Sequence, residues 1–336
     1  MKHVGGLLTL IMIAALLVTV PGAALAQGGL DPVCTGLTDA DCQLLTGSTA
    51  AMEGIQAFSI PNFSVDFGLN SVDGETTFNA AGSGHVMVPE GIEEMTTPEG
   101  LLLHLVLDTV DYSTPTDSNA GTGQILIRDN MLYVLYDGEW YGGELEADEE
   151  AAEESLEAAD IEDLAALQQQ LADLDIDMTG VVTTVRGADT DAMGQPIANF
   201  TTSVDITNLF MAGRPAPGFG QAGGPTGGAE GQEAMTAEDM QMVSAMLAPM
   251  FQGTTISFTQ GIGTEDSLLH SFALDVVLNA DLSMFDPEVG AVAGTLNVSA
   301  DLDEFNGVFD IPAPESYRPL EELDQQLGGV TESLGM

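Results

Sequence analysis

The chain has 336 residues, with 53 acidic residues against five Lys and Arg, which gives a formal net charge of −48 at pH 7. A surface this acidic repels nucleic acid and anionic membrane headgroups, so we expect no nucleic-acid partner. Hydrophobic residues make up 44% of the chain. Because many of them fall in alternating runs, we expect a folded protein and not a disordered acidic chain.

Residues 1–26 have the parts of a secretory signal peptide. Lys2 and His3 begin it, an apolar stretch runs from Leu7 to Val20, and small residues precede the expected cleavage site after Ala26. The alternative, an N-terminal membrane anchor, is disfavoured because the apolar stretch is short for a span. Cleavage leaves 336 − 26 = 310 residues and a net charge of 4 − 53 = −49. We therefore expect an exported protein (extracellular, cell-surface or periplasmic) that does not span a membrane after cleavage.

The two cysteines, Cys34 and Cys42, lie close together near the start of the mature chain. In an exported protein, a disulfide is the expected state of such a pair. A metal site is the less favoured alternative, because no histidine lies nearby. Cys34 is too far beyond the apolar stretch for a lipobox, so we do not expect an N-terminal lipid anchor.

Alternating apolar and polar residues predict that most of the chain forms strands. A helix over 38–54 precedes them, with Thr38 and Asp41 in the spacing of a capping box. In the strand over 101–110, leucines at every second position fall on one face. The strands are expected over the following ranges: 58–70, 75–88, 101–110, 125–128, 131–136, 179–186, 197–207, 254–261, 267–281 and 292–301.

The stretch from Gly121 to Leu145 has the clearest hairpin pattern. Two apolar, aromatic and β-branched runs flank Asp129-Asn130, and both of these residue types tolerate the positive φ of a two-residue turn. Asp137-Gly138 predicts a second turn, and Trp140, the only Trp of the chain, follows it.

Two further helices are expected to interrupt the strands. The first, over 146–173, has an acidic beginning and an apolar stripe that includes Leu167 and Leu171. The second, over 236–251, presents Met240, Met246 and Met250 on one face. Between the later strands, residues 212–232 are rich in Gly and Pro and predict a flexible insert.

This order of elements, together with short motifs in the hairpin and near the end, resembles the LolA-like superfamily of bacterial lipoprotein carriers. The resemblance is closest to its LppX/LprG lipid-binding branch. The residues that carry it are Ile125, Ile127, Asp129, Tyr133, Val134, Asp137, Gly138, Trp140, Tyr141, Leu296, Val298, Ser299, Phe305, Phe309, Asp310, Ile311, Pro312, Ala313 and Pro314.

The resemblance implies an α+β fold in which a strongly curved antiparallel sheet, a half-barrel, has helices packed on its concave face. Residues 27–336 would form one such domain. The family binds lipids or lipoprotein acyl chains between sheet and helices and has no catalytic residues. The absent lipobox and the insert over 212–232 are departures from the family pattern.

The polar residues favour no catalytic or metal chemistry. His85, His104 and His270 have no nucleophile or metal-ligand partner at a recognisable spacing, so we expect no enzyme activity. Alternating carboxylates at Asp173–Asp177 and at Asp301 and Asp303 keep Ca²⁺ open as an alternative, although neither has EF-hand spacing. We otherwise expect no cofactor and no metal.

We therefore expect an exported, non-enzymatic binder or carrier of a lipid or other lipophilic molecule. The leucine faces over 101–107 and 268–278 would line the cavity, and flexible methionines would adapt to the ligand. The candidate lining residues are Leu103, Leu105, Leu107, Tyr133, Trp140, Leu167, Leu171, Met240, Met246, Met250, Phe272 and Leu274. Two alternatives remain: an envelope or cell-surface protein that acts through a protein partner with its cavity filled, and an acidic cation buffer.

Overall fold

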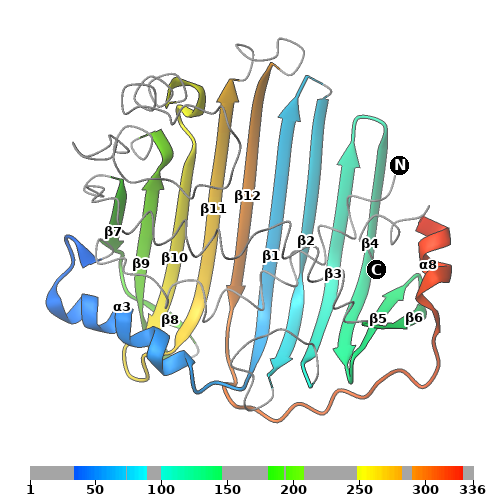
Figure 1. Cartoon of the computed structure of the whole chain (residues 1–336). Helices are drawn as coiled ribbons and strands as arrows, with labels where there is room; N and C mark the ends of the chain where they lie inside the picture. Colours follow the sequence, from blue (N-terminus) through cyan, green and yellow to red (C-terminus); the bar gives the residue numbers. More distant parts are fainter. Residues whose placement is uncertain are drawn as a thin grey trace, which may run out of the picture.

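The computed structural model describes residues 34–72, 74–88, 100–145, 181–192, 194–207, 248–281 and 290–327. They form a curved, unclosed sheet of 13 strands, almost entirely antiparallel (Figure 1). This is the α+β half-barrel expected from the sequence. The signal peptide, the expected helix over 146–173, the insert over 212–232 and most of the expected helix over 236–251 lie outside the described residues.

The sheet is built from long strands joined mainly by hairpins. The elements in chain order are α3 (Asp39–Met52), β1 (Ala57–Ser71), β2 (Gly74–Met87), β3 (Leu102–Thr114), β4 (Asp117–Arg128), β5 (Met131–Tyr136), β6 (Glu139–Glu144), β7 (Val182–Arg186), β8 (Thr190–Ala192), β9 (Gln195–Asp205), the 3₁₀ helix η3 (Ala248–Phe251), β10 (Thr255–Gly263), β11 (Leu269–Asp281), β12 (Ala291–Asp301), β13 (Arg318–Pro319) and α8 (Leu320–Leu327).

The first and last long strands meet in the middle of the sheet. The order across it is β13-β6-β5-β4-β3-β2-β1-β12-β11-β10-β9-β7, and β8 pairs beside β9. β12 is antiparallel to β1, with Val65 opposite Val298 and Phe67 opposite Leu296. The N-terminal and C-terminal halves of the chain are therefore joined by this central pair.

The two expected hairpin turns form as their residue types indicate. Asp129 and Asn130 have φ of 51° and 61°, as a tight turn with two left-handed residues requires. Asp137 and Gly138 follow with φ of 50° and 80°. Together they fold β4, β5 and β6 into a meander at one end of the sheet.

Strand alternation separates the sheet into an apolar face and a polar face. On β1 the apolar face carries Phe63, Val65, Phe67 and Leu69, while the residues between them are polar or glycine. Directly paired residues point to the same side in an antiparallel sheet, so the register extends each face from strand to strand. Serine and threonine hydroxyls pair across the polar face, as in Ser64–Ser299, Thr201–Thr259 and Ser203–Ser257.

Both described α-helices lie on the apolar face, near opposite ends of the sheet. Leu45 and Met52 of α3 belong to the same buried cluster as the apolar side chains of the sheet. At the other end, Leu320 of α8 lies against Gly143 of β6. The helix at the N-terminal end begins at the expected cap, where Thr38 Oγ1 accepts from the Asp41 backbone N–H, and the expected disulfide joins Cys34 to Cys42.

A strap over residues 302–317 runs along the lower edge of the sheet, from the end of β12 to β13 (Figure 1). Its contacts with the sheet lie on the polar face. Asp303 and Ser59 exchange backbone hydrogen bonds at its beginning, and Phe309 packs on His85 with ring centroids 4.6 Å apart. Arg128 donates to the Ile311 carbonyl, and Tyr317 meets Tyr133 edge-on at 5.2 Å. The strap therefore covers β2 to β6 on the side opposite the helices.

The structure differs from the expected strands in two places: β4 is longer than expected, and β8 is an additional strand. β4 begins at Asp117, eight residues before the expected start, and pairs with β3 through Tyr112–Asn119 and Thr114–Asp117. Its first half is Ser, Asn, Ala, Gly and Thr, so it has no apolar alternation to reveal it. β8 lies between the strands expected over 179–186 and 197–207, in a stretch where no strand was expected. Among the described residues, no helix is long and apolar enough to cross a membrane.

Candidate functional site

The apolar face divides into a closed part and a half-buried part. The closed part lies near α3 and includes Phe63, Val65, Phe272 and Val298, each no more than 4% exposed. Leucines 103, 105 and 107 of β3 continue it. Gly84 of β2 makes room for Leu105, because a Cβ at this glycine would lie 2.6 Å from Leu105 Cδ2.

Farther along the same strands, the apolar side chains are only partly buried. They belong to β1, β9, β10, β11 and β12. Because β1 and β12 lie at the centre of the sheet, the partial exposure of these side chains is not explained by a position on an edge strand. We call this set the half-buried zone. Its members are Phe67, Leu69, Val204, Ile256, Phe258, Leu274, Val276, Leu278, Val292 and Leu296.

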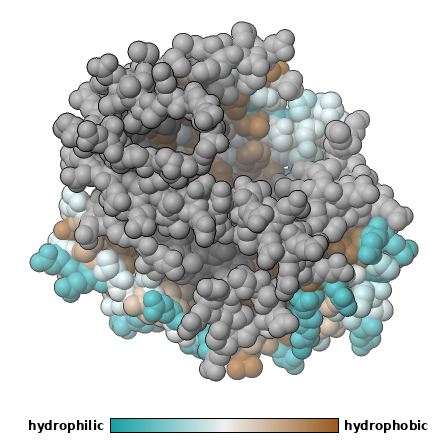
Figure 2. Space-filling model, in the orientation of Figure 1, coloured by the Kyte–Doolittle hydropathy of each residue, from teal (hydrophilic) through white to brown (hydrophobic). Residues whose placement is uncertain are grey.

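The face of the sheet that carries the half-buried zone has no charged side chain on these five strands. Its polar neighbours on the same face are neutral, namely Gln260 of β10 and Thr202 of β9. Asp66 and Asp275 lie on the zone strands but point to the polar face, because each is next to a zone residue in the alternation. In Figure 2, brown hydrophobic surface is visible in the upper half of the view. An apolar, partly open surface of this kind suits a ligand without charge.

The structure brings some of the expected lining residues together. Leu103, Leu105, Leu107 and Phe272 lie in the closed part of the apolar face, and Leu274 lies in the half-buried zone. Met250 is buried in η3, which packs against β11. Leu167, Leu171, Met240 and Met246 lie outside the described residues. The proposal that these residues line a cavity remains a prediction.

Tyr133 and Trp140 are placed on the polar face, away from the leucines. Tyr133 pairs with Leu126, which pairs with His104, whereas the apolar face of β4 carries Ile125 and Ile127. Trp140 pairs with Leu135 on the same side as Tyr133. Both residues were expected to line the cavity, but the hairpin register turns them to the side of the strap, where Tyr317 packs on Tyr133.

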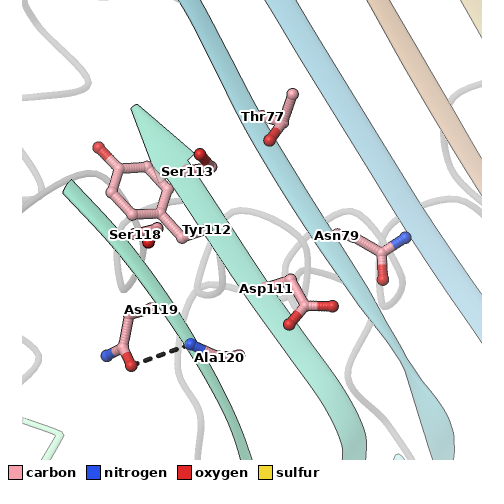
Figure 3. Close-up of a pocket in the computed structure, with 8 residues that line it drawn as sticks. All are labelled: Thr77, Asn79, Asp111, Tyr112, Ser113, Ser118, Asn119 and Ala120. Atoms are coloured by element: carbon pink, nitrogen blue, oxygen red, sulfur yellow. Dashed lines mark hydrogen bonds between the residues drawn. The ribbon is translucent and has the colours of Figure 1, made fainter. Parts of the chain in front are cut away.

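A separate hollow lies on the polar face, at the ends of β2, β3 and β4 (Figure 3). Its volume is about 370 Å³, and its lining is mostly polar: Thr77, Asn79, Asp111, Tyr112, Ser113, Ser118, Asn119 and Ala120. It is shallow, lies on the opposite side from the half-buried zone, and contains none of the expected lining residues. It is not the lipophilic site that the sequence predicts.

His85 and His104 pack against each other on the polar face of the sheet. His85 and His104 stack with ring centroids 6.2 Å apart and an interplanar angle of 9°. His104 Nε2 lies 3.2 Å from Gln124 Oε1, and the Nδ1 atoms of both rings are buried without a hydrogen-bond partner. Burial lowers the pKa of His85, His104 adds to the effect, and Glu304 opposes it.

His270 is 8% exposed and contacts Asp266 through Nε2 at 3.0 Å. Within the described ranges, no three His, Cys, Asp or Glu side chains converge in a way that could hold a metal ion. Of the carboxylates considered for Ca²⁺, Asp301 accepts from Asn62 Nδ2 at 3.3 Å, and Asp173–Asp177 lie outside these ranges.

An unclosed antiparallel sheet with helices on its apolar face is the architecture that the sequence resemblance implied. The C-terminal strap across the other face was not expected. The described residues form a curved antiparallel half-barrel. No protein-family model matches the sequence, and no curated protein matches it. Among solved structures, the chain is similar to lipoprotein LppX of Mycobacterium tuberculosis, at 11% identity and a TM-score of 0.32 over 82% of this chain and 100% of that one.

LprF of Mycobacterium bovis gives 11% identity and a TM-score of 0.30, over 82% of this chain and 96% of that one. At identities and TM-scores this low, nothing about ligands is transferred from either protein to this chain.

Sequence reasoning did not single out most of the half-buried zone. Phe67, Phe258 and Leu296 lie in strands that were expected, and their alternation with polar residues was visible. Alternation identifies the face of a strand but not how far a second layer covers it. The distinction between the closed part and the half-buried part therefore required the structure.

Proposed function

We propose that this protein is an exported, non-enzymatic carrier that binds a lipid or similar lipophilic molecule against the half-buried zone. The observation that carries the proposal is the partial exposure of ten apolar side chains on strands that include the centre of the sheet. Central strands of a sheet normally bury such residues under a second layer. An acyl chain laid on this surface would supply that layer.

The energetics suit a hydrocarbon ligand. Removing acyl methylene groups from water stabilises the complex by about 0.8 kcal/mol for each CH₂. The zone extends over five neighbouring strands without a charged side chain on its face, so an extended chain would meet no desolvated charge. The disulfide Cys34–Cys42 supports export to an oxidising compartment.

The first experiment is native mass spectrometry of the mature protein, purified without detergent from its own host and then extracted with solvent. We expect an added mass that is recovered as lipid. A clean apo mass that does not change after incubation with host lipids would contradict the carrier function. That outcome would favour the alternative, an envelope protein that acts through a protein partner.

Two adjacent valines of β11 allow a matched test. Val276 lies in the half-buried zone, whereas Val277 is 37% exposed on the polar face. We expect Val276→Asn to reduce lipid uptake about tenfold or more, because the amide group must be desolvated under the acyl chain. Val277→Asn should leave uptake unchanged. Equal losses in both variants, measured as bound lipid per protein, would count against the zone as the site.

A further inference from the structure

We infer that the half-buried zone selects uncharged lipids, such as acylglycerols, and rejects lipids with a phosphate or carboxylate headgroup. The inference rests on the proposed function and specifies the class of ligand. Its basis is the distribution of the few positive charges in the chain and of the acids behind the zone.

The described arginines are all engaged elsewhere. After residue 26, the sequence contains four Arg and no Lys. Arg186 of β7 pairs with Asp41 and Asp189 and lies over the Phe200 ring. Its pair with Asp41 joins α3 to the sheet. Its charge is therefore already balanced at the edge of the sheet.

Arg128 and Arg318 have structural partners of the same kind. Arg128 contacts Asp129 and donates to the Ile311 carbonyl of the strap. Arg318 pairs with Glu139 and with Glu322, and so ties β13 and α8 to β6. Neither residue is on a strand of the half-buried zone. Arg214 is the remaining arginine and lies outside the described residues.

Helix N-termini are the other common partners of anionic groups, because their free N–H groups point outward. In both described α-helices this position is already acidic. Asp39 and Asp41 lie in the first turn of α3, and Glu321 and Glu322 lie in the first turn of α8. An added anion at either end would face carboxylates.

Carboxylates also lie directly behind the zone. Asp275 follows Leu274 and precedes Val276 on β11, and Asp66 precedes Phe67 on β1. Both point to the polar face, with one layer of strands between them and the zone. A like charge roughly 10 Å away across such a layer lowers affinity on the order of tenfold. The neutral Gln260 offers N–H donors to an ester carbonyl. Thr202, whose hydroxyl lies 3.0 Å from that of Thr184, adds a second uncharged polar group.

The test compares two lipids that share their acyl chains, dioleoylglycerol and dioleoyl phosphatidic acid. The mature full-length protein is incubated with each at low salt, and bound lipid is measured by native mass spectrometry. We expect dioleoylglycerol to bind at least about tenfold better. The preference should shrink as NaCl is raised, because salt screens the repulsion.

Two variants test which carboxylate repels the lipid phosphate. Asp275→Asn should raise binding of dioleoyl phosphatidic acid several-fold and leave dioleoylglycerol unchanged. The matched control is Asp111→Asn, on the polar face of β3, which lies outside the zone and four strands from β11. It should change the binding of either lipid much less than Asp275→Asn does. An equal effect of both variants would overturn the role of the acids behind the zone.

The outcomes separate the two proposals. Equal binding of both lipids, or a preference for phosphatidic acid, would overturn the selectivity while leaving the carrier function intact. If Arg214→Gln then abolished phosphatidic acid binding, that arginine would be identified as the headgroup partner. Failure of both lipids to bind would overturn the carrier function and the selectivity together.

Discussion

Gly84 shows how little space the closed part of the apolar face contains. A Cβ at this position would lie 2.6 Å from both the His104 carbonyl oxygen and Leu105 Cδ2. We expect Gly84→Ala to lower the free energy of unfolding by about 1–3 kcal/mol, because neither a backbone oxygen nor a packed leucine can move aside freely.

The control for this variant is Gly121→Ala on β4, where a Cβ would meet nothing within 4 Å. Urea unfolding of the two variants provides the measurement. A Gly84→Ala protein as stable as the Gly121→Ala protein would show that β2 and β3 are farther apart than the structure indicates.

His85 makes the stability depend on pH. Its pKa lies below the usual 6.5, first because of burial and then because of His104. As the pH falls through 6.5, the unfolded chain therefore takes up a proton before the folded protein does, and stability decreases until the folded pKa is passed. We expect the loss of unfolding free energy between pH 7 and pH 5 to be smaller in His85→Gln. Identical losses in the two proteins would contradict this assignment.

At the residue scale, the sequence was informative about which face of a strand is apolar. Leu103, Leu105 and Leu107 share the apolar face, as their spacing predicts. Tyr133 and Trp140 lie on the opposite face from these leucines, because hairpin register, and not aromatic character, decides the side on which a residue lies. The half-exposure of Phe67 depends on long-range packing and could not be predicted from residue 67 and its neighbours.

At the scale of elements, the strap is held by contacts that can be removed one at a time. Arg128→Gln loses the charged donor to the Ile311 carbonyl. Hydrogen bonds from charged groups contribute about 1.5–3 kcal/mol, so we expect cleavage within 302–317 by a nonspecific protease to accelerate roughly tenfold or more.

Val308→Ser is the control on the same strap, because Val308 is 95% exposed. Its cleavage rate should match that of the unmodified protein. If Arg128→Gln were cleaved no faster than Val308→Ser, the strap would be held mainly by Phe309 and Tyr317, and the arginine would contribute little.

Elements with strong local patterns were predictable, and those without them were not. The Asp129-Asn130 turn follows from residue chemistry alone. The first half of β4 has small and polar residues, and it forms a strand because β3 provides a partner. The pairing of β12 with β1 joins residues more than 200 positions apart. The alternation of apolar and polar residues identified β1 and β12 as strands, but it contains no information about which strand each one pairs with.

At the scale of the whole molecule, net charge should make stability depend on salt. The formal charge of −48 at pH 7 comes from 53 acids against five basic residues. NaCl weakens the few ion pairs, but it also screens a much larger number of repulsions. We expect Tm to rise as NaCl increases from 0.05 M to roughly 1 M. A falling Tm would show that the arginine pairs dominate.

The two margins of the sheet differ in a way that affects self-association. At one margin, β13 pairs over only two residues, one of which is Pro319 without an N–H, and α8 begins at the next residue. At the other margin, β7 has no strand on its outer side among the described residues. A molecule with one open strand edge can join a second copy edge to edge, and that pairing uses up both edges. Among the described strands, addition at the β7 edge would therefore stop at a two-fold pair.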